Sequence, residues 1–138
     1  MQIFENVPIL NKASLLEMLR SRVADEKKLS EIPNPALLHD APKAAKKIAE
    51  AVREGKKIAL VGDYDVDGVS ATAIMADFFR QIPYPLETFI PNRFHDGYGV
   101  SPTILERIDA DIIITVDNGI TAIEAASICQ EREIGRAH

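Results

Sequence analysis

Residues 57–68 read KIALVGDYDVDG, an apolar run that passes directly into an acidic turn. The apolar part, Ile58 to Val61, is short and continuous, which is typical of a strand covered on both faces. Residues 68–81 then carry apolar side chains at helical spacing, so a helix is expected directly after the turn. A buried strand that leads into a helix is the repeating unit of a parallel α/β sheet.

The same alternation continues on both sides of this unit. Further helices are expected over residues 14–24, 42–54, 102–108 and 120–131. Further strands are expected over residues 86–90 and 111–116. The pattern predicts an α/β fold with a Rossmann-like, mostly parallel sheet flanked by helices. We expect an amino-terminal helical segment and connection over residues 1–40 and the α/β domain over residues 41–134.

The composition indicates an acidic globular protein. Hydrophobic residues make up 46% of the 138 residues, enough to bury a core without staples, and the net charge is −5. That charge argues against sequence-blind nucleic-acid binding over the whole surface, which depends on Lys and Arg. The start of the chain lacks a signal-peptide pattern, and no window has the roughly 18 apolar residues of a membrane span, so a cytoplasmic location is expected. The single cysteine, Cys129, is expected to be buried on a helix.

Two acidic turns follow predicted strands. The first contains Asp63, Asp65 and Asp67, and the second contains Asp117 within residues 115–119, TVDNG. Both turns fall at the carboxyl ends of strands, where open parallel sheets bind their ligands. Carboxylates so close together repel one another, and a divalent cation relieves that repulsion. Oxygen ligands with a single cysteine and few histidines favour Mg²⁺ or Mn²⁺ over a structural zinc ion.

Three other interpretations explain less of the pattern. Aspartates that merely cap helices would not account for two acidic turns at successive strand ends. An EF-hand loop also opens with D-x-D-x-D-G, but its twelfth position counted from Asp63 requires glutamate and is Ile74 here. A haloacid-dehalogenase type of phosphatase could use residues 65–68, yet it leaves Asp63 and the second turn unexplained. The sequence contains neither a Walker A loop nor a G-x-G-x-x-G fingerprint.

Three stretches resemble motifs of one family and occur in that family's order. Residues 58–68 resemble motif I of the DHH phosphoesterases, and residues 114–120, ITVDNGI, are similar to motif II. Residues 91–102, PNRFHDGYGVSP, resemble a stretch typical of RecJ exonucleases. Weaker similarity extends over about residues 29–131. The resemblance is to the amino-terminal part of a RecJ-type enzyme, so residues 41–134 would be a partial DHH domain with motifs I and II only.

The resemblance implies a nuclease that removes nucleotides from the 5′ end of single-stranded DNA in DNA repair and recombination. Such an enzyme hydrolyses phosphodiesters with two Mn²⁺ or Mg²⁺ ions. On the family's pattern, Asp65 and Asp67 each bind one ion and Asp117 bridges the pair, which makes these three the catalytic residues. Asp63 is a further metal ligand or a group that orients one.

Substrate contacts are expected from the RecJ-like stretch. Arg93 is the candidate for a phosphate contact, because its guanidinium forms bidentate bonds, and the alternative for it is a surface salt bridge. Asn92 and Tyr98 are further candidates, and Tyr98 either stacks on a base or packs the loop. Single-stranded DNA is therefore the expected partner of the full-length protein, with no membrane and no identified protein partner.

The family's later motifs, including its Asp-His-His triplet, are not found in this sequence. Residues 131–134 approach the strand that would carry the triplet, and residues 135–138, GRAH, are expected not to continue it and to be a scar of truncation. The chain alone is therefore expected to bind metal weakly and to lack exonuclease activity. Two alternatives stay open for the parent protein. One is a DHH phosphoesterase acting on short oligonucleotides, cyclic dinucleotides or pyrophosphate, and the other is a non-catalytic binding module in replication or repair.

Overall fold

The computed structural model describes residues 11–14, 16–17 and 29–137, which belong to two units, residues 1–34 and residues 35–138. None of the helices in these described ranges combines the length and the apolar character needed to cross a membrane.

The first unit contains helical residues 12–14 and 16–17 and the 3-10 turn η1 (Leu29–Glu31). The helix begins before Ser14, because the Ser14 N–H donates to Asn11 Oδ1 at 2.9 Å. The predicted start at Ser14 is therefore two residues late. The remainder of that predicted helix, residue 15 and residues 18–24, lies outside the described residues.

Four parallel strands form one sheet in the second unit, in the order β2-β1-β3-β4. Their bounds are Ile58–Val61 for β1, Leu86–Phe89 for β2, Ile112–Thr115 for β3 and Gly135–Ala137 for β4. The chain adds β2 on one side of β1 and then β3 on the other. The strand order thus reverses between β1 and β3, and open α/β sheets bind ligands at this switch point.

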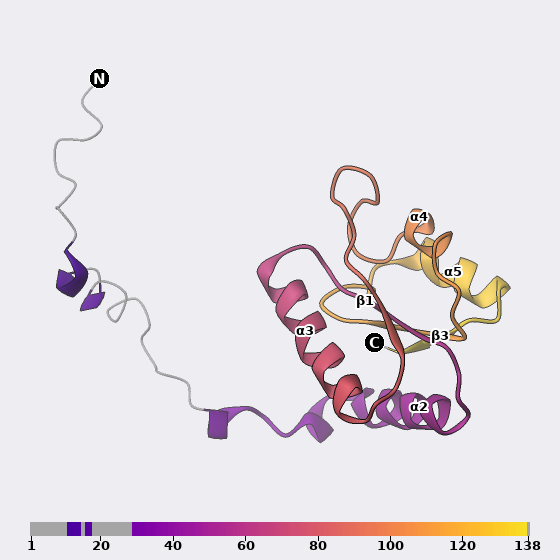
Figure 1. Ribbon diagram of the computed structural model, residues 1–138, viewed down its shortest axis with the longest axis horizontal. Helices are drawn as coiled ribbons and strands as arrows, with labels where there is room; N and C mark the ends of the chain where they lie inside the picture. The colour runs from indigo at the N-terminus through magenta and orange to yellow at the C-terminus, as the bar shows by residue number, and fades with distance from the viewer. Residues whose placement is uncertain (1–10, 15, 18–28, 138) are drawn as a thin grey trace. The chain divides into compact units, whose positions relative to one another are not determined.

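Helices cover both faces of this sheet, as Figure 1 shows. On one face lie α2 (Ala41–Arg53), which follows the turn η2 (Pro35–Leu37), and α3 (Val66–Gln81). On the other face lie α4 (Pro102–Leu105) and α5 (Ile123–Glu131). The side chains of β1 alternate between the two layers, so all four of its residues are buried, as the apolar run predicts.

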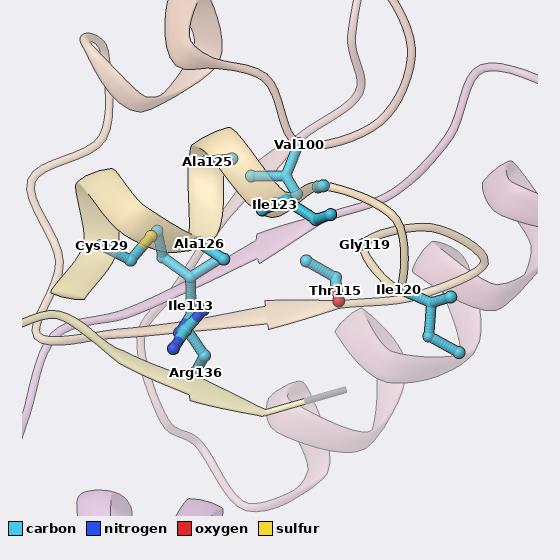
Figure 2. A pocket seen from close by; sticks show the side chains of 11 residues that line it. Val100, Ile113, Thr115, Gly119, Ile120, Ile123, Ala125, Ala126, Cys129 and Arg136 are labelled. Carbon is cyan, nitrogen blue, oxygen red and sulfur yellow. The ribbon is translucent and has the colours of Figure 1, made fainter.

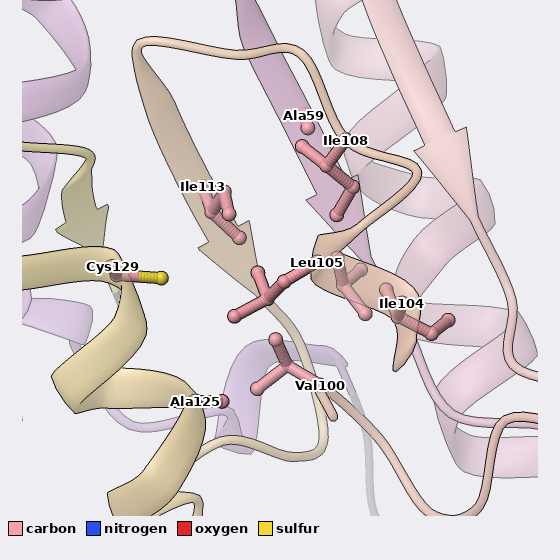
Figure 3. Packing of buried hydrophobic residues seen from close by; sticks show 9 residues of the cluster. Ala59, Val100, Ile104, Leu105, Ile108, Ile113, Ala125 and Cys129 are labelled. Carbon is pink, nitrogen blue, oxygen red and sulfur yellow. The ribbon is translucent and has the colours of Figure 1, made fainter. Parts of the chain in front are cut away.

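Each face has its own apolar core. Figure 3 shows the core under α4 and α5, where Ile113 meets Leu105 and Cys129. Cys129 is buried on a helix as predicted, and its burial raises the pKa of the thiol, although Arg136 and Arg132 oppose that shift. The opposite core contains Phe79, a side chain whose full burial stabilises a fold by about 1.5–3 kcal/mol.

The structure confirms the predicted α/β class but shortens two helices. The helix expected over residues 102–108 ends at Leu105, because the Ile108 N–H donates to the Leu105 carbonyl in a tighter turn. The helix expected from Ile120 begins at Ile123, because Gly119 takes a φ of 102° and residues 119–122 form a turn.

The carboxyl end differs from the expectation. Residues 135–138 were expected not to continue a strand, and this is wrong for Gly135–Ala137, which pair in parallel with Ile112–Ile114. The Gly135 N–H also donates to the Asp111 carbonyl at 2.9 Å. Backbone pairing with β3 is open to almost any side chain, so a sequence that lacks a strand pattern still forms one here. His138 lies outside the described residues.

Candidate functional site

The register of β1 and β3 brings the two acidic turns together. Val61 is the pairing partner of Thr115, and the Val116 N–H donates to the Val61 carbonyl at 3.1 Å. Asp63 and Asp117 each follow these paired residues by two positions. Both aspartates therefore leave the sheet at the same edge, beside the switch point.

The first turn is organised by its own backbone. Asp63 is 1% exposed, and its Oδ1 accepts a hydrogen bond from the Tyr64 N–H at 2.8 Å. Asp65 caps α3, because its Oδ1 accepts from the Gly68 N–H at 2.9 Å. A Cβ at Gly68 would lie 2.7 Å from the Asp63 nitrogen, so glycine is what allows α3 to begin this close to Asp63.

The helix-capping role weighed against metal binding is thus real for Asp65. The cap uses one oxygen of the Asp65 carboxylate. An ionised carboxylate accepts bonds at both of its oxygens, so the second oxygen can still bind a cation. Asp67 lies in the first turn of α3, where the helix dipole favours a negative charge. Asp65 and Asp67 are exposed, whereas Asp63 is enclosed.

The second turn has an unusual backbone. Asp117 takes a φ of 59°, a left-handed conformation that few residues other than glycine adopt and that recurs at functional sites. The next residue, Asn118, bonds through its side chain to three separate backbone groups. Gly119 follows with a φ of 102°, and a Cβ there would lie 2.5 Å from Thr115 Oγ1.

The four aspartates form one electrostatic cluster. Partial desolvation, together with the negative charges of Asp65, Asp67 and Asp63, raises the pKa of Asp117. The ion pairs within the described part of the chain include none of these four carboxylates. The cluster is therefore a concentration of negative charge in which, among the described residues, no carboxylate forms an ion pair.

This donor set fits a hard divalent cation. All of the gathered donors are carboxylate oxygens, which Mg²⁺ and Mn²⁺ prefer. Desolvation is the largest cause of the raised pKa of Asp117, and the repulsion from the neighbouring carboxylates that adds to it is what a cation would relieve. As the side chains are oriented, however, no three His, Cys, Asp or Glu groups in the described ranges stand close enough to hold a metal ion. The turns assemble donors for a metal site without completing its coordination shell.

The loop after β2 lies beside the cluster through aromatic contacts. The Arg93 guanidinium carbon is 5.5 Å from the centroid of the Tyr64 ring, within cation–π range. Tyr64 meets Tyr98 edge to face at 6.3 Å, and the Tyr98 hydroxyl donates to the Asp117 carbonyl at 3.3 Å. Among the described residues, no ion pair includes Arg93, so its alternative role in a surface salt bridge finds no support.

Asn92 shapes this loop from within. Its Oδ1 accepts from the Phe94 N–H at 2.9 Å, and its own N–H donates to Asp96 Oδ2 at 2.8 Å. Asp96 is buried and forms an ion pair with Arg107 at 3.1 Å. The Asn92 N–H bond and the Arg107 charge lower the pKa of Asp96, although burial opposes them.

Sequence reasoning gave no role to Asp96, Asn118 or Tyr64. Asp96 lies in the loop after β2 and Arg107 follows α4, eleven positions later, so the ion pair joins two separate segments and no pattern within one element indicates it. Two of the three partners of Asn118 are distant in sequence: Val100 is 18 positions away and Val61 is 57 positions away. Only Tyr64 carried a local signal, as an aromatic residue inside the acidic turn.

Two pockets adjoin the second turn. One, of about 470 Å³, is lined by Tyr98, Thr115, Asp117, Asn118, Gly119, Ile120 and Thr121. The other, of about 270 Å³, lies between β3 and α5, is mostly apolar and has Arg136 at one side (Figure 2). Thr115 lines both pockets, and its buried hydroxyl oxygen has no hydrogen-bond partner within the described part of the chain.

Comparison with known proteins shows the family of the chain. Residues 57–136, more than half of the chain, match the model of the DHH family, N-terminal domain. The chain is 29% identical over 133 residues to the single-stranded-DNA-specific exonuclease RecJ of Haemophilus influenzae, a match that covers 94% of this chain and 23% of the relative. It is 34% identical over 119 residues to the Escherichia coli exonuclease of the same name, covering 83% of this chain and 21% of the relative. The chain thus spans less than a quarter of the length of these relatives.

A solved structure, exonuclease RecJ bound to manganese, superposes with a TM-score of 0.63 at 35% sequence identity. The superposition covers 68% of this chain and 25% of that chain. This likeness confirms the predicted fold class. The manganese in that relative is consistent with divalent metal use by proteins of this kind.

Proposed function

The chain belongs to the DHH family, and from this premise we propose that its two acidic turns supply metal ligands for a single-stranded-DNA-specific 5′-to-3′ exonuclease. The observation that carries the proposal is the convergence of Asp63, Asp65 and Asp67 on Asp117 at the switch point of the sheet. The names of the RecJ relatives support the substrate class. A role in DNA repair and recombination and a cytoplasmic location belong to the same proposal.

The metal-binding roles follow the surroundings of each carboxylate. Two bound Mn²⁺ or Mg²⁺ ions would supply an activated water and stabilise the attacking and leaving oxygens at phosphorus. Asp65 and Asp67, both exposed at the start of α3, would each hold one ion, and Asp117 would be shared between them. Asp63 is enclosed and bonded to the Tyr64 N–H, which suits a residue that orients the others.

The substrate would lie along the loop beside the cluster. Arg93 presents an exposed guanidinium next to the acidic turns, where it would bind a phosphate oxygen. Tyr98 is 59% exposed and offers a ring on which a base can stack. Asn92 remains a third candidate for a substrate contact, although its side-chain oxygen already accepts from the Phe94 N–H.

Calorimetric titration of the chain with Mn²⁺ and with Mg²⁺ tests the metal site. We expect weak binding that disappears in Asp65→Ala/Asp67→Ala. The matched control is Glu87→Gln/Asp109→Asn, which removes the same charge from exposed positions at the opposite edge of the sheet. Equal loss of binding in both double variants would mean that general negative charge, and not the acidic turns, attracts the cation.

Digestion of 5′-labelled single-stranded DNA tests the reaction. We expect no digestion by the 138-residue chain, because it spans less than a quarter of its relatives' length. In the full-length protein we expect Mn²⁺-dependent digestion that Asp67→Ala and Asp117→Ala each abolish and Asp109→Asn preserves. Release of product only from cyclic dinucleotides, pyrophosphate or very short oligonucleotides would redirect the proposal to another DHH phosphoesterase activity.

A further inference from the structure

A single amide side chain joins three pieces of the backbone around the acidic cluster. Asn118 Nδ2 donates to the Val61 carbonyl at 3.0 Å and to the Val116 carbonyl at 2.8 Å. Asn118 Oδ1 accepts from the Val100 N–H at 3.0 Å. Both amide hydrogens and one acceptor position are therefore in use.

Each of these backbone groups belongs to a different part of the proposed site. Val61 ends β1, two residues before Asp63, and Val116 directly precedes Asp117. Val100 closes the loop that carries Arg93 and Tyr98, and its side chain is anchored in the core under α4 and α5 (Figure 3). The Asn118 side chain is thus the point where both acidic turns and the loop are fixed to one another.

We infer that Asn118 is a positioning residue, which holds the Asp117 turn and the Tyr98 loop in register with the end of β1 so that metal and substrate ligands form one site. This inference rests on the proposed function. It extends that function by assigning the site's assembly to a residue whose side-chain hydrogen bonds go to backbone groups of the protein.

The chemistry of the position favours asparagine over its closest relative in shape. Aspartate has the same size but no N–H donors when ionised, so it would face the Val61 and Val116 carbonyl oxygens without a hydrogen to share. It would also add a fifth negative charge beside the cluster.

The loop that faces the Asn118 side chain also restricts which residue it can carry. Gly99 takes a φ of 55°, and a Cβ there would lie 2.8 Å from the Asn118 Cβ. Gly97, in the same loop, takes a φ of 82°, and a Cβ there would meet nothing within 4 Å. Both glycines therefore have a backbone conformation that strains other residues, but only a Cβ at position 99 would meet Asn118.

Substitutions of Asn118 separate positioning from charge. If position 118 affected Mn²⁺ binding only through the charge of its side chain, Asn118→Asp would tighten that binding. We expect it instead to weaken Mn²⁺ binding roughly 10–100-fold, the range for residues that orient metal ligands. Asn118→Ala should weaken binding similarly and remove the hydrogen-exchange protection of the Val100 amide. Circular dichroism and the unfolding midpoint show whether each variant is folded, since lost stability alone would not change the affinity of the folded chain.

The glycine pair supplies a test that leaves Asn118 in place. We expect Gly99→Ala to reduce both Mn²⁺ affinity and Val100 amide protection, and Gly97→Ala to retain both. Unchanged affinity and protection in Asn118→Asp and Gly99→Ala would overturn the inference while the proposed function stands. A wild-type chain that binds no Mn²⁺ would overturn the proposed metal site. In that case an unchanged Val100 amide in Asn118→Ala would overturn the inference as well.

Discussion

The two acidic turns lie side by side, yet they are built in different ways. In the turn after β1, the carboxylates of Asp63 and Asp65 are fixed by N–H groups no more than three residues away. In the turn after β3, Asp117 has a left-handed backbone, and its neighbour Asn118 is tied to residues as far away as Val61. The first turn is a local structure, whereas the second depends on the assembled sheet.

This difference has a practical meaning for the cluster. A local turn keeps its shape as long as its own residues are intact, so damage to it should follow from changes inside residues 62–68. The second turn should respond to changes anywhere along its long-range bonds. The cluster then combines two carboxylates held by local hydrogen bonds, Asp63 and Asp65, with Asp117, whose place is set by tertiary contacts.

The largest effect on stability is expected from Gly68→Ala, which changes the turn after β1. The added Cβ would lie 2.6 Å from the Asp63 Cβ and 2.7 Å from its nitrogen, so backbone must move. We expect a loss of about 3 kcal/mol in the free energy of unfolding, the upper end for overpacking. Urea denaturation in the presence of a chelator measures it.

Gly55→Ala is the matched control for that variant. Gly55 takes a φ of 68°, but a Cβ there would meet nothing within 4 Å. Its cost should be limited to backbone strain of about 1–2 kcal/mol. If both variants lost the same stability, the close approach of α3 to Asp63 would not be what requires glycine.

Asp65→Ala should have the next largest effect. It removes the oxygen that accepts from the Gly68 N–H, and loss of such a helix cap costs about 1 kcal/mol. Asp65→Asn keeps that acceptor and removes only the charge, so its unfolding free energy should equal or exceed that of the wild type. Equal destabilisation by alanine and asparagine would show that charge, not capping, fixes the start of α3.

Asp117→Asn should have a smaller effect, and of opposite sign. Asparagine tolerates the left-handed backbone, so the variant removes charge without changing the turn. Because the folded-state pKa of Asp117 is raised, the metal-free wild type should lose stability as pH rises from the ordinary aspartate range through that raised pKa. At neutral pH the variant should be more stable than the wild type, and the difference should vanish in acid.

Thermal unfolding of both proteins between pH 3 and pH 7 measures this difference. A gain in stability that is the same at every pH would rule out relief of carboxylate repulsion as its cause. Added Mn²⁺ should reverse the order at neutral pH, because only the wild type keeps the full set of carboxylates.

The smallest effect is expected from Tyr98→Phe. It removes an exposed hydroxyl whose bond to the Asp117 carbonyl is long, at 3.3 Å, and so should cost about 0.5 kcal/mol. Tyr98→Ala also removes the edge-to-face contact with Tyr64, worth about 0.5–1.5 kcal/mol more. Chemical denaturation of the two variants separates the contributions. If Tyr98→Phe lowers the free energy of unfolding by more than expected, the hydroxyl stabilises the second turn.

The sequence predicted the local turn better than the distant contacts. The apolar run of β1 and the helical spacing after it identified the strand, the turn and α3. The meeting of the two turns followed from the rule that parallel strands end at a common edge. The long-range bonds of Asn118 and the ion pair of Asp96 with Arg107 join separate elements of the fold, so no local pattern indicated them. Strand β4 was missed because backbone pairing, not side-chain character, forms it.

The helix cap made by Asp65, together with the metal-binding role proposed for it, restricts which residue position 65 accepts. Serine or threonine would cap α3 but offer no charge, and asparagine would do the same. Glutamate would bring the charge but is a poor cap, because its longer side chain does not reach back to the N–H groups of the first turn. Aspartate alone meets both demands, so selection on helix stability and selection on chemistry converge on one residue type. Variation at this position among natural sequences should therefore be far narrower than at either of its neighbours, Tyr64 and Val66.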